Sequence, residues 1–347
     1  MSLSFLRDHG GRRIHHYDEQ PLLLTDGVEA TDVSNDTVEL GYEAMPDNWA
    51  PRDVPPAPGP ACWALCPVRF VDGKDVGRTV AWLQDPEGHP VPVRLSEIGA
   101  VVMRTVDGCL RREWYTVERV VTMMARHFPW DEVERFALAL QEHDFRLLLS
   151  QDPEKGPSFD LERMRKTTQN RSNDEMIRLE RQALAQASSV PTVVDGRLEP
   201  RVGAFNPETD PIVGLVKTHY QNYLHPQGWR TLYTLRPGQR TPAFVVKATN
   251  LDVVTWYLRL AGDGGEMPNW GVVRLEAPLL YFEKMLSKDW GYIDTLSRTI
   301  GSYRCRDGSY GRAAVSILPI QRAEERLGAL FRPGDSLCNH FYTLTEL

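Results

Sequence analysis

The stretch PTVVDGRLEP (residues 191–200) joins a short apolar run to an aspartate, a glycine and a polar segment. An Asp-Gly pair is typical of a tight turn, because glycine adopts positive φ freely and aspartate caps its own turn. No matching strand follows here, so we expect Asp195 at the carboxyl end of a buried strand, facing an opening. Sites in α/β proteins tend to form at such strand ends.

The same Val-Asp-Gly tripeptide occurs in RFVDGK (69–74) and in TVDGCL (105–110). Asp107 stands between two alternating strand patterns, with Asp-Gly as the whole link, and we assign it to a hairpin turn. Asp72 ends one expected strand and a second strand follows. Two interpretations of Asp72 therefore remain, a hairpin turn and a functional carboxylate. Asp72 and Asp195 on adjacent buried strands would repel unless a cation lay between them. Hard oxygen ligands of this kind select Mg²⁺ or Mn²⁺.

A third carboxylate is expected from the long helix that precedes the strand of Asp195. At helical spacing Glu180 falls inside the apolar face of residues 176–187, whereas Glu175 falls outside it. A carboxylate on a buried face needs a partner. The alternative is a solvated helix surface on which both glutamates pair with nearby arginines.

The order of strand and helix patterns predicts one mixed α/β unit over residues 61–347. Residues 1–60 are rich in Pro, Asp and Gly, and we expect an N-terminal arm that covers this unit. Strands are expected at 64–71, 76–85, 91–106, 109–117, 189–196, 208–220, 229–238, 243–248, 254–261 and 270–278. Helices are expected at 116–128, 130–151, 159–187, 278–290 and 320–331.

Composition indicates a soluble globular protein of one or two domains, with 347 residues of which 41% are hydrophobic and 25% charged. No apolar run approaches the ~20 residues that cross a bilayer, and we expect a cytoplasmic protein with no membrane partner. The formal net charge of −7 argues against finding nucleic acid by bulk electrostatics, but not against receiving it from a partner. Without a disulfide or zinc pattern, we expect buried reduced thiols at Cys62, Cys66, Cys109, Cys305 and Cys338.

Several short blocks in a fixed order resemble the NurA nuclease family, over roughly residues 64–331. The blocks are FVDG, RLERQAL, VVDGRL, VGLVKTHYQNYL, LRPGQRTPAF, TWYLRL, WGVVRLE and ILPIQRAEERL. That family works with a HerA-type hexameric translocase ATPase in DNA end processing and, in some bacterial operons, in antiphage defence. The resemblance implies a ribonuclease H-like mixed sheet flanked by helices, a homodimer, and Mn²⁺- or Mg²⁺-dependent cleavage of DNA.

The resemblance also implies the site residues. The family's first acidic motif falls on Asp72, its second is matched best by Glu180, and its third falls on Asp195. Archaeal members carry a histidine in a C-terminal motif, where this chain has LPIQRAEERL and no histidine. We favour Glu324 as the fourth ligand, because Pro319 would aim the first helical turn at the site. His340, or a site of three carboxylates, remains the alternative.

Such a site would hydrolyse phosphodiesters with two metal ions, one activating water and the other stabilising the leaving 3′ oxygen. Asp72 would bridge the ions, and Glu180 and Asp195 would each complete one coordination shell. Lys217 would hold the scissile phosphate, unless it is a strand-end lysine in solvent.

Other residues have two interpretations each. Arg240 and Arg259 position the DNA backbone or pair with carboxylates. Aromatic residues at three positions belong to the core, or stack on bases: Trp256, Tyr257 and Trp270.

Two other functions compete with the nuclease. A catalytically inactive dimeric adaptor of the ATPase ring would keep the fold without the metal site. A glycosidase using Asp72 and Asp195 would need sugar-stacking aromatics beside the acids, which VVDGRL does not offer.

Overall fold

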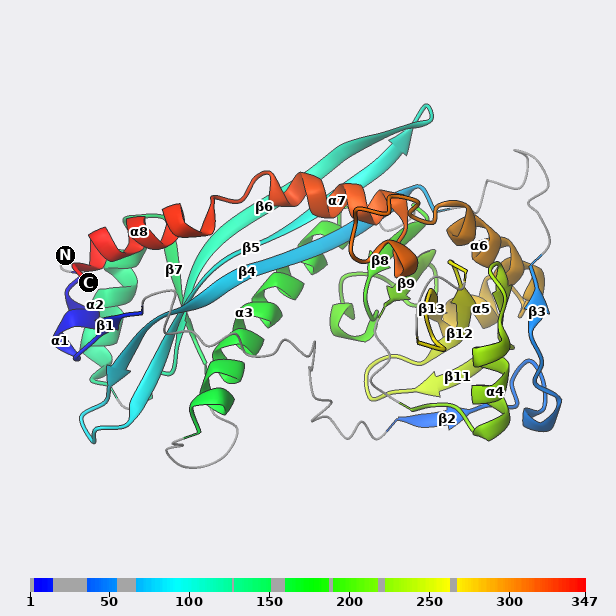
Figure 1. The fold of residues 1–347 in the computed structure, drawn as a ribbon, viewed down its shortest axis with the longest axis horizontal. Coiled ribbons are helices and arrows are strands. Elements are labelled where there is room, and N and C mark those ends of the chain that lie inside the picture. Colours follow the sequence, from blue (N-terminus) through cyan, green and yellow to red (C-terminus); the bar gives the residue numbers. More distant parts are fainter. Residues whose placement is uncertain are drawn as a thin grey trace.

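A single mixed sheet runs through the protein (Figure 1), as a computed structural model describes it for residues 3–14, 36–54, 67–126, 128–150, 160–186, 190–217, 222–262 and 267–347. Within these residues the main path of the sheet is β2 (Thr37–Glu39), β11 (Phe244–Lys247), β12 (Val253–Arg259), β13 (Val272–Pro278), β9 (Ile212–Val216), β8 (Thr192–Asp195), β4 (Arg69–Gln84), β5 (Pro90–Val106), β6 (Cys109–Met123) and β7 (Phe145–Leu149). Three short strands pair beside this path: β1 (Arg12–Arg13), β3 (Arg52–Asp53) and β10 (Gln239–Arg240).

Parallel pairing occurs in two parts of the described sheet. Strands β4, β8 and β9 are parallel neighbours, and β6 and β7 form a further parallel pair. The long strands β4, β5 and β6 are antiparallel to one another. The predicted mixed α/β sheet flanked by helices is therefore confirmed.

Two helices cover opposite faces of the sheet at these central strands (Figure 1). Helix α3 (Leu161–Leu184) packs below β4 and β5 in that view, and α7 (Leu318–Gly328) lies above them. The remaining helices are α1 (Phe5–Asp8), α2 (Trp130–Gln141), α4 (Pro226–Thr234), α5 (Leu279–Lys284), α6 (Trp290–Ser302) and α8 (Gly334–Thr345). None of the helices in the described ranges is both long and apolar enough to span a bilayer.

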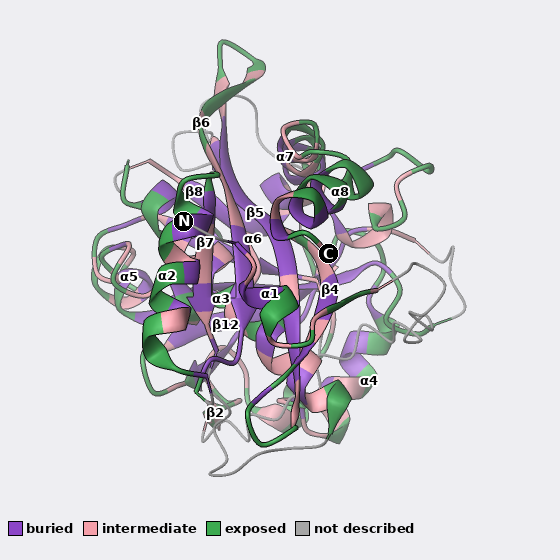
Figure 2. Cartoon of the chain, turned by 90° about the vertical axis from the view of Figure 1, so that its left-hand side faces the viewer, coloured by how far each residue is buried: buried purple, intermediate pink, exposed green. Residues whose placement is uncertain are grey.

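The side chains of β4 alternate between two cores, as the pleat of a strand requires. Phe70 packs on the α7 face with Ile320, whereas Val71 packs on the α3 face with Ala183. The central strands are buried and the tip of the β5–β6 hairpin is exposed (Figure 2). Asp72 therefore points to the α7 face, and the position of Gly73 to the α3 face.

Two of the three Asp-Gly pairs differ from the simplest turn interpretation. The prediction for Asp107 is confirmed, since Asp107 (φ 51°) and Gly108 (φ 74°) form the whole turn between β5 and β6. The hairpin at Asp72 is wrong, because β4 continues unbroken from residue 69 to residue 84. Gly196 closes β8 with φ 102°, a conformation that glycine adopts without strain.

Three predicted elements differ in type from the structure over part or most of their length. The expected helix at 116–128 is largely the end of β6, where the β-branched run at 120–122 pairs with β5. The expected helix at 130–151 ends at Gln141, and Asp144 at φ 62° leads into strand β7. The expected strand at 229–238 is mostly helix α4, which begins at Pro226, a residue favoured in the first turn.

The N-terminal region is built into the sheet where it is described. Strand β1 pairs with β4, β2 with β11, and β3 with β10. Trp49 is buried in the core on the α3 face, and Arg7 forms an ion pair with Glu346, so the two ends of the chain lie together (Figure 1). The rest of the predicted arm, residues 15–35 and 55–60, lies outside the described residues.

The cysteine prediction is correct for two residues and wrong for one. Cys305 and Cys338 are buried free thiols, whereas Cys109 is exposed beside the β5–β6 turn. Cys62 and Cys66 lie outside the described residues.

Candidate metal centre

Asp72 and Asp195 lie side by side because of strand register. Strands β4 and β8 are parallel with Val71 opposite Val194, so the next residue of each strand points to the same face. Helix α7 crosses this face and adds Glu324. Ligand oxygens of Asp72, Asp195 and Glu324 all lie within 4.8 Å of one another.

Helix α7 is oriented by its apolar side. Pro319 occupies its first turn, and Ile320, Ala323 and Leu327 are buried against the sheet. Glu324 follows Ala323 directly and therefore lies at the margin of this buried side. The structure thus brings together the two aspartates and the glutamate that the sequence predicted as ligands.

Asp72 is the deepest of these acids. Its exposed fraction is 3%, and its Oδ2 atom is buried with no hydrogen-bond partner. Burial raises the pKa of Asp72 well above its ordinary value, and the charge of Asp195 raises it further. A buried carboxylate oxygen without a partner is costly, and a divalent cation would satisfy it. Three hard oxygen donors fit Mg²⁺ or Mn²⁺.

The outer edge of the group is open to solvent. The side chains of Asp195 and Glu324 are 16% and 25% exposed. A substrate could reach the acids from this edge while Asp72 stays covered.

Lys217 lies among the acids rather than in solvent. It follows β9, its side chain is 8% exposed, and its Nζ donates to Asp195 Oδ2 at 2.8 Å and to Glu324 Oε1 at 3.3 Å. Burial alone lowers the pKa of Lys217, but the charges of Asp195 and Glu324 outweigh it and the pKa is raised. Lys217 is therefore a buried, charged ammonium group.

Tyr310 is a contact that the sequence interpretation missed. Its hydroxyl donates to Glu324 Oε2 at 2.6 Å, so Glu324 is held on one oxygen by Tyr310 and on the other by Lys217. Burial raises the pKa of Tyr310, and the hydrogen bond to Glu324 raises it further. Tyr310 lies in the polar loop RDGSYGR, where nothing in the local sequence sets it apart.

Glu180 is buried near this group, but it approaches from the other face of the sheet. A Cβ atom at Gly73 would lie 2.8 Å from Glu180 Oε1, on the side of β4 opposite to Asp72. Arg201 donates to Glu180 Oε2 at 2.6 Å and to the backbone oxygen of Asp195 at 3.0 Å. The structure therefore places Glu180 outside the set of three close carboxylates, with Arg201 as its partner.

The pKa of Glu180 is raised to about 7. Burial is the largest cause, the Arg201 ion pair opposes it, and the charge of Asp195 adds to it. The sequence did not predict Arg201 as the partner of Glu180. An arginine in the polar segment EPR (199–201), just after VVDGRL, is typical of exposed surface.

Glu175 corrects a prediction about helix α3. It is buried rather than outside the buried face, and it forms ion pairs with Arg146, Arg171 and Arg178. Those contacts make Glu175 a structural acid, with the arginine pairs that the alternative predicted but at a buried position rather than a solvated one.

A DNA contact and a carboxylate ion pair were both open for Arg240 and Arg259, and the structure shows internal contacts for both. Arg240 is buried, pairs with both oxygens of Glu43, and donates from Nε to Asp294 at 2.7 Å. Arg259 is buried and donates to the backbone oxygens of Pro268 and Trp270, both at 2.6 Å. Neither guanidinium is available to position DNA.

The structure also shows where the three aromatic residues and the alternative ligand His340 lie. Trp256 and Tyr257 are buried, as the core interpretation predicted, whereas Trp270 is exposed. His340 on α8 is exposed and its ring stacks on Phe145 of a different core cluster, with ring centroids 6.1 Å apart. His340 is therefore not a ligand of this group.

A second acidic group, of Asp85, Glu87 and His89, has a structural explanation. Asp85 Oδ1 accepts the backbone N–H groups of Glu87 at 2.9 Å and of His89 at 2.7 Å. Its carboxylate also bonds the His89 ring. Those bonds close the turn between β4 and β5, which explains why these side chains lie together.

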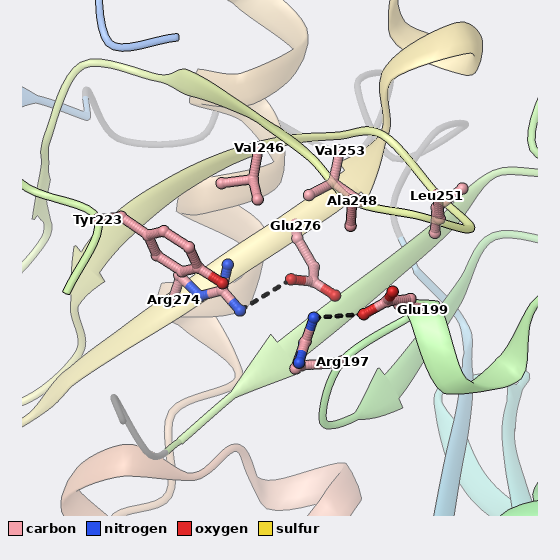
Figure 3. Close-up of a pocket in the computed structure, with 9 residues that line it drawn as sticks. All are labelled: Arg197, Glu199, Tyr223, Val246, Ala248, Leu251, Val253, Arg274 and Glu276. Atoms are coloured by element: carbon pink, nitrogen blue, oxygen red, sulfur yellow. Dashed lines mark hydrogen bonds and ion pairs between the residues drawn. The ribbon is translucent and has the colours of Figure 1, made fainter. Parts of the chain in front are cut away.

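A small pocket is lined in part by Arg197 and Glu199, which belong to the segment that follows Asp195 (Figure 3). At its base, Glu276 accepts the backbone N–H of Leu198 at 2.6 Å and forms an ion pair with Arg274 at 3.0 Å. Arg197 pairs with Glu199 at its rim. These contacts fix the loop and hence the end of β8.

No family model and no curated protein matches the chain. Among solved structures, it is similar to the NurA nuclease from Sulfolobus solfataricus, with a TM-score of 0.44 and 10% sequence identity over 80% of this chain and 81% of that chain. A likeness of this degree assigns no function to the chain. The function must be inferred from the chemistry of its own side chains.

Proposed function

We propose that the protein is a metal-dependent deoxyribonuclease that hydrolyses DNA phosphodiesters at the Asp72, Asp195 and Glu324 group. One observation carries the proposal: three carboxylates converge within 4.8 Å, and the most buried of them has an oxygen with no partner. Such a group needs compensating positive charge, of which Lys217 supplies one unit and a divalent cation would supply the rest. The order of sequence motifs that resembles the NurA nuclease family supports DNA as the substrate.

Each residue of the group would have a distinct role. Asp72, Asp195 and Glu324 would hold the ion, and Tyr310 would orient Glu324 through its hydroxyl hydrogen bond. A divalent ion in such a site activates water and stabilises charge on phosphate oxygens. Lys217 would place a fixed positive charge beside the phosphate, because it stays protonated among the acids.

The test compares three chemically identical substitutions at the three Val-Asp-Gly sites. Asp72→Asn and Asp195→Asn should abolish cleavage of end-labelled linear DNA in Mn²⁺, whereas Asp107→Asn should leave it unchanged. Asn tolerates the positive φ of the Asp107 turn, which makes that variant a matched control. EDTA should abolish cleavage by the wild type. Equal cleavage by all variants would exclude this site.

The inactive adaptor makes the opposite prediction in the same experiment. It would show no cleavage in any metal and no saturable Mn²⁺ binding by calorimetry. The adaptor would be excluded if the wild type cleaves DNA and binds Mn²⁺ saturably, and Asp72→Asn loses both.

We further propose, from the sequence resemblance, a ribonuclease H-like homodimer that acts with a HerA-type hexameric ATPase in DNA end processing or antiphage defence. Light scattering on the purified chain would test the homodimer. Cleavage rates with and without such an ATPase would test the partnership, and an unchanged rate with no complex on a sizing column would exclude it.

A further inference from the structure

We infer that the site takes one divalent ion, and that Lys217 supplies the positive charge that a second ion would bring. This inference rests on the proposed function and deepens it. It differs from the two-ion mechanism that the sequence analysis predicted for this site.

The compactness of the carboxylates favours a single ion. Their ligand oxygens lie within 4.8 Å of one another. Oxygens on opposite sides of one Mg²⁺ ion are about 4.2 Å apart, since each bond is about 2.1 Å long. The three side chains therefore need to move little to share one coordination sphere. Asp72 Oδ2, buried and without a partner, is the oxygen that such an ion would satisfy first.

Lys217 competes with a second ion for the carboxylate oxygens of the group. Two-metal sites hold their ions about 3.5–4 Å apart, so a second ion needs further carboxylate oxygens beside those that hold the first. Lys217 Nζ already donates to Asp195 Oδ2 at 2.8 Å and to Glu324 Oε1 at 3.3 Å. Tyr310 takes the other oxygen of Glu324 at 2.6 Å.

Glu180, which the predicted two-ion mechanism assigns to one of the two coordination shells, is engaged elsewhere. Glu180 lies on the α3 face of the sheet, where Arg201 donates to its Oε2 atom at 2.6 Å. Arg201 also donates to the backbone oxygen of Asp195, which anchors it in place. Recruiting Glu180 would leave the buried Arg201 guanidinium without its counter-charge, at a large cost.

Charge balance points to the same stoichiometry. Three carboxylates and the Lys217 ammonium leave two negative charges in the group, which one divalent ion neutralises. A second divalent ion would create an excess of two positive charges in a largely buried site. A phosphodiester carries only one negative charge and would not offset that excess.

The experiment counts Mn²⁺ ions per chain by calorimetry and by electron paramagnetic resonance, without measuring activity. The wild type should bind one ion and give the spectrum of an isolated Mn²⁺. Lys217→Met removes the charge at similar length, and should bind a second, weaker ion that couples magnetically to the first. Lys217→Arg keeps the charge and should still bind one ion.

Lys247→Met is the matched control, because Lys247 is exposed on β11 and pairs with Glu39 far from the acids. It should bind one ion. Two coupled ions in the wild type, or a single ion in a folded Lys217→Met protein, would overturn the inference and leave the proposed nuclease standing. Failure of the proposed function gives a different result, namely no saturable binding by the wild type.

Discussion

Gly73 leaves room on β4 for the Glu180 carboxylate. A Cβ atom at this position would lie 2.8 Å from Glu180 Oε1 and 2.1 Å from Met176 Sδ, both on helix α3. The glycine of the first Val-Asp-Gly therefore serves close packing, whereas Gly108 serves a turn and Gly196 ends a strand. The identical tripeptides have three different physical explanations.

Gly73→Ala should displace Glu180 and weaken its ion pair with Arg201. Overpacking in a tight core costs about 1–3 kcal/mol, and urea denaturation would measure the loss. Gly301→Ala is the matched control, because nothing lies within 4 Å of its added Cβ and it sits near the end of helix α6. That variant should be neutral or slightly stabilising. Equal stability of the two variants would contradict the close packing at Gly73.

The raised pKa of Glu180 predicts a pH dependence of stability in the metal-free protein. Its pKa is about 7 in the folded chain against an ordinary value of 4.5, so the folded state binds more protons between these values. The free energy of unfolding should therefore fall as pH rises from about 4.5 to 7, by up to about 1.4 kcal/mol per pH unit from this group. Asp72, with its own raised pKa, acts in the same direction.

Denaturation curves recorded in EDTA across this pH range would test the prediction. Glu180→Gln should flatten the slope, whereas Glu134→Gln, at an exposed position on α2, should leave it unchanged. A slope that is the same in both variants would show that Glu180 does not titrate in this window.

At the scale of elements, the site depends on how closely α7 and its C-terminal end lie on β5. A Cβ atom at Gly99 would lie 3.0 Å from Leu327 Cδ1 and 3.1 Å from Phe331 Cε1, and 2.7 Å from the backbone oxygen of Thr116. Gly99 thus sets the distance between the helix and the sheet, and Glu324 lies one turn before Leu327 on the same helix.

Gly99→Ala should push α7 outward and draw Glu324 away from the aspartates. We expect a loss of about 1–3 kcal/mol of stability and weaker Mn²⁺ binding, measured by denaturation and calorimetry on the same preparation. The Gly301→Ala control should show neither. Mn²⁺ affinity equal to that of the wild type would show that α7 keeps its position.

At the scale of the whole molecule, the described N-terminal segments belong to the body of the protein. Trp49 is buried on the α3 face, where its ring lies 5.8 Å from that of Phe244 and its backbone oxygen accepts the Thr231 hydroxyl at 3.1 Å. Strands β2 and β3 extend the sheet beside it.

Trp49→Ala should destabilise the whole protein by about 3–5 kcal/mol, because it removes a large buried side chain. The midpoint of urea denaturation, followed by circular dichroism, would measure the shift. Trp130→Ala is the control, since Trp130 is exposed at the start of α2. An unchanged midpoint for Trp49→Ala would show that this segment is a detachable arm.

Local sequence predicted what depends on local chemistry. The turn at Asp107 follows from Asp-Gly between alternating strands, and the C-terminal part of α3 follows from its apolar periodicity. The predicted helix was wrong over residues 116–123, which belong to strand β6. Pairing of β6 with β5 along its whole length overrides the short helical pattern there.

The sequence by itself determined the mixed α/β class and the position of Asp195 at a strand end, since apolar patterning and residue chemistry are written along the chain. Tertiary structure alone decided which acids converge, and it placed Asp72 inside the long strand β4. Register between β4 and β8 joined Asp72 to Asp195, and the packing of α7 added Glu324. The alternation of β4 placed Glu180 on the opposite face with Arg201. Pairings of residues so far apart in the chain depend on packing, which local patterns do not encode.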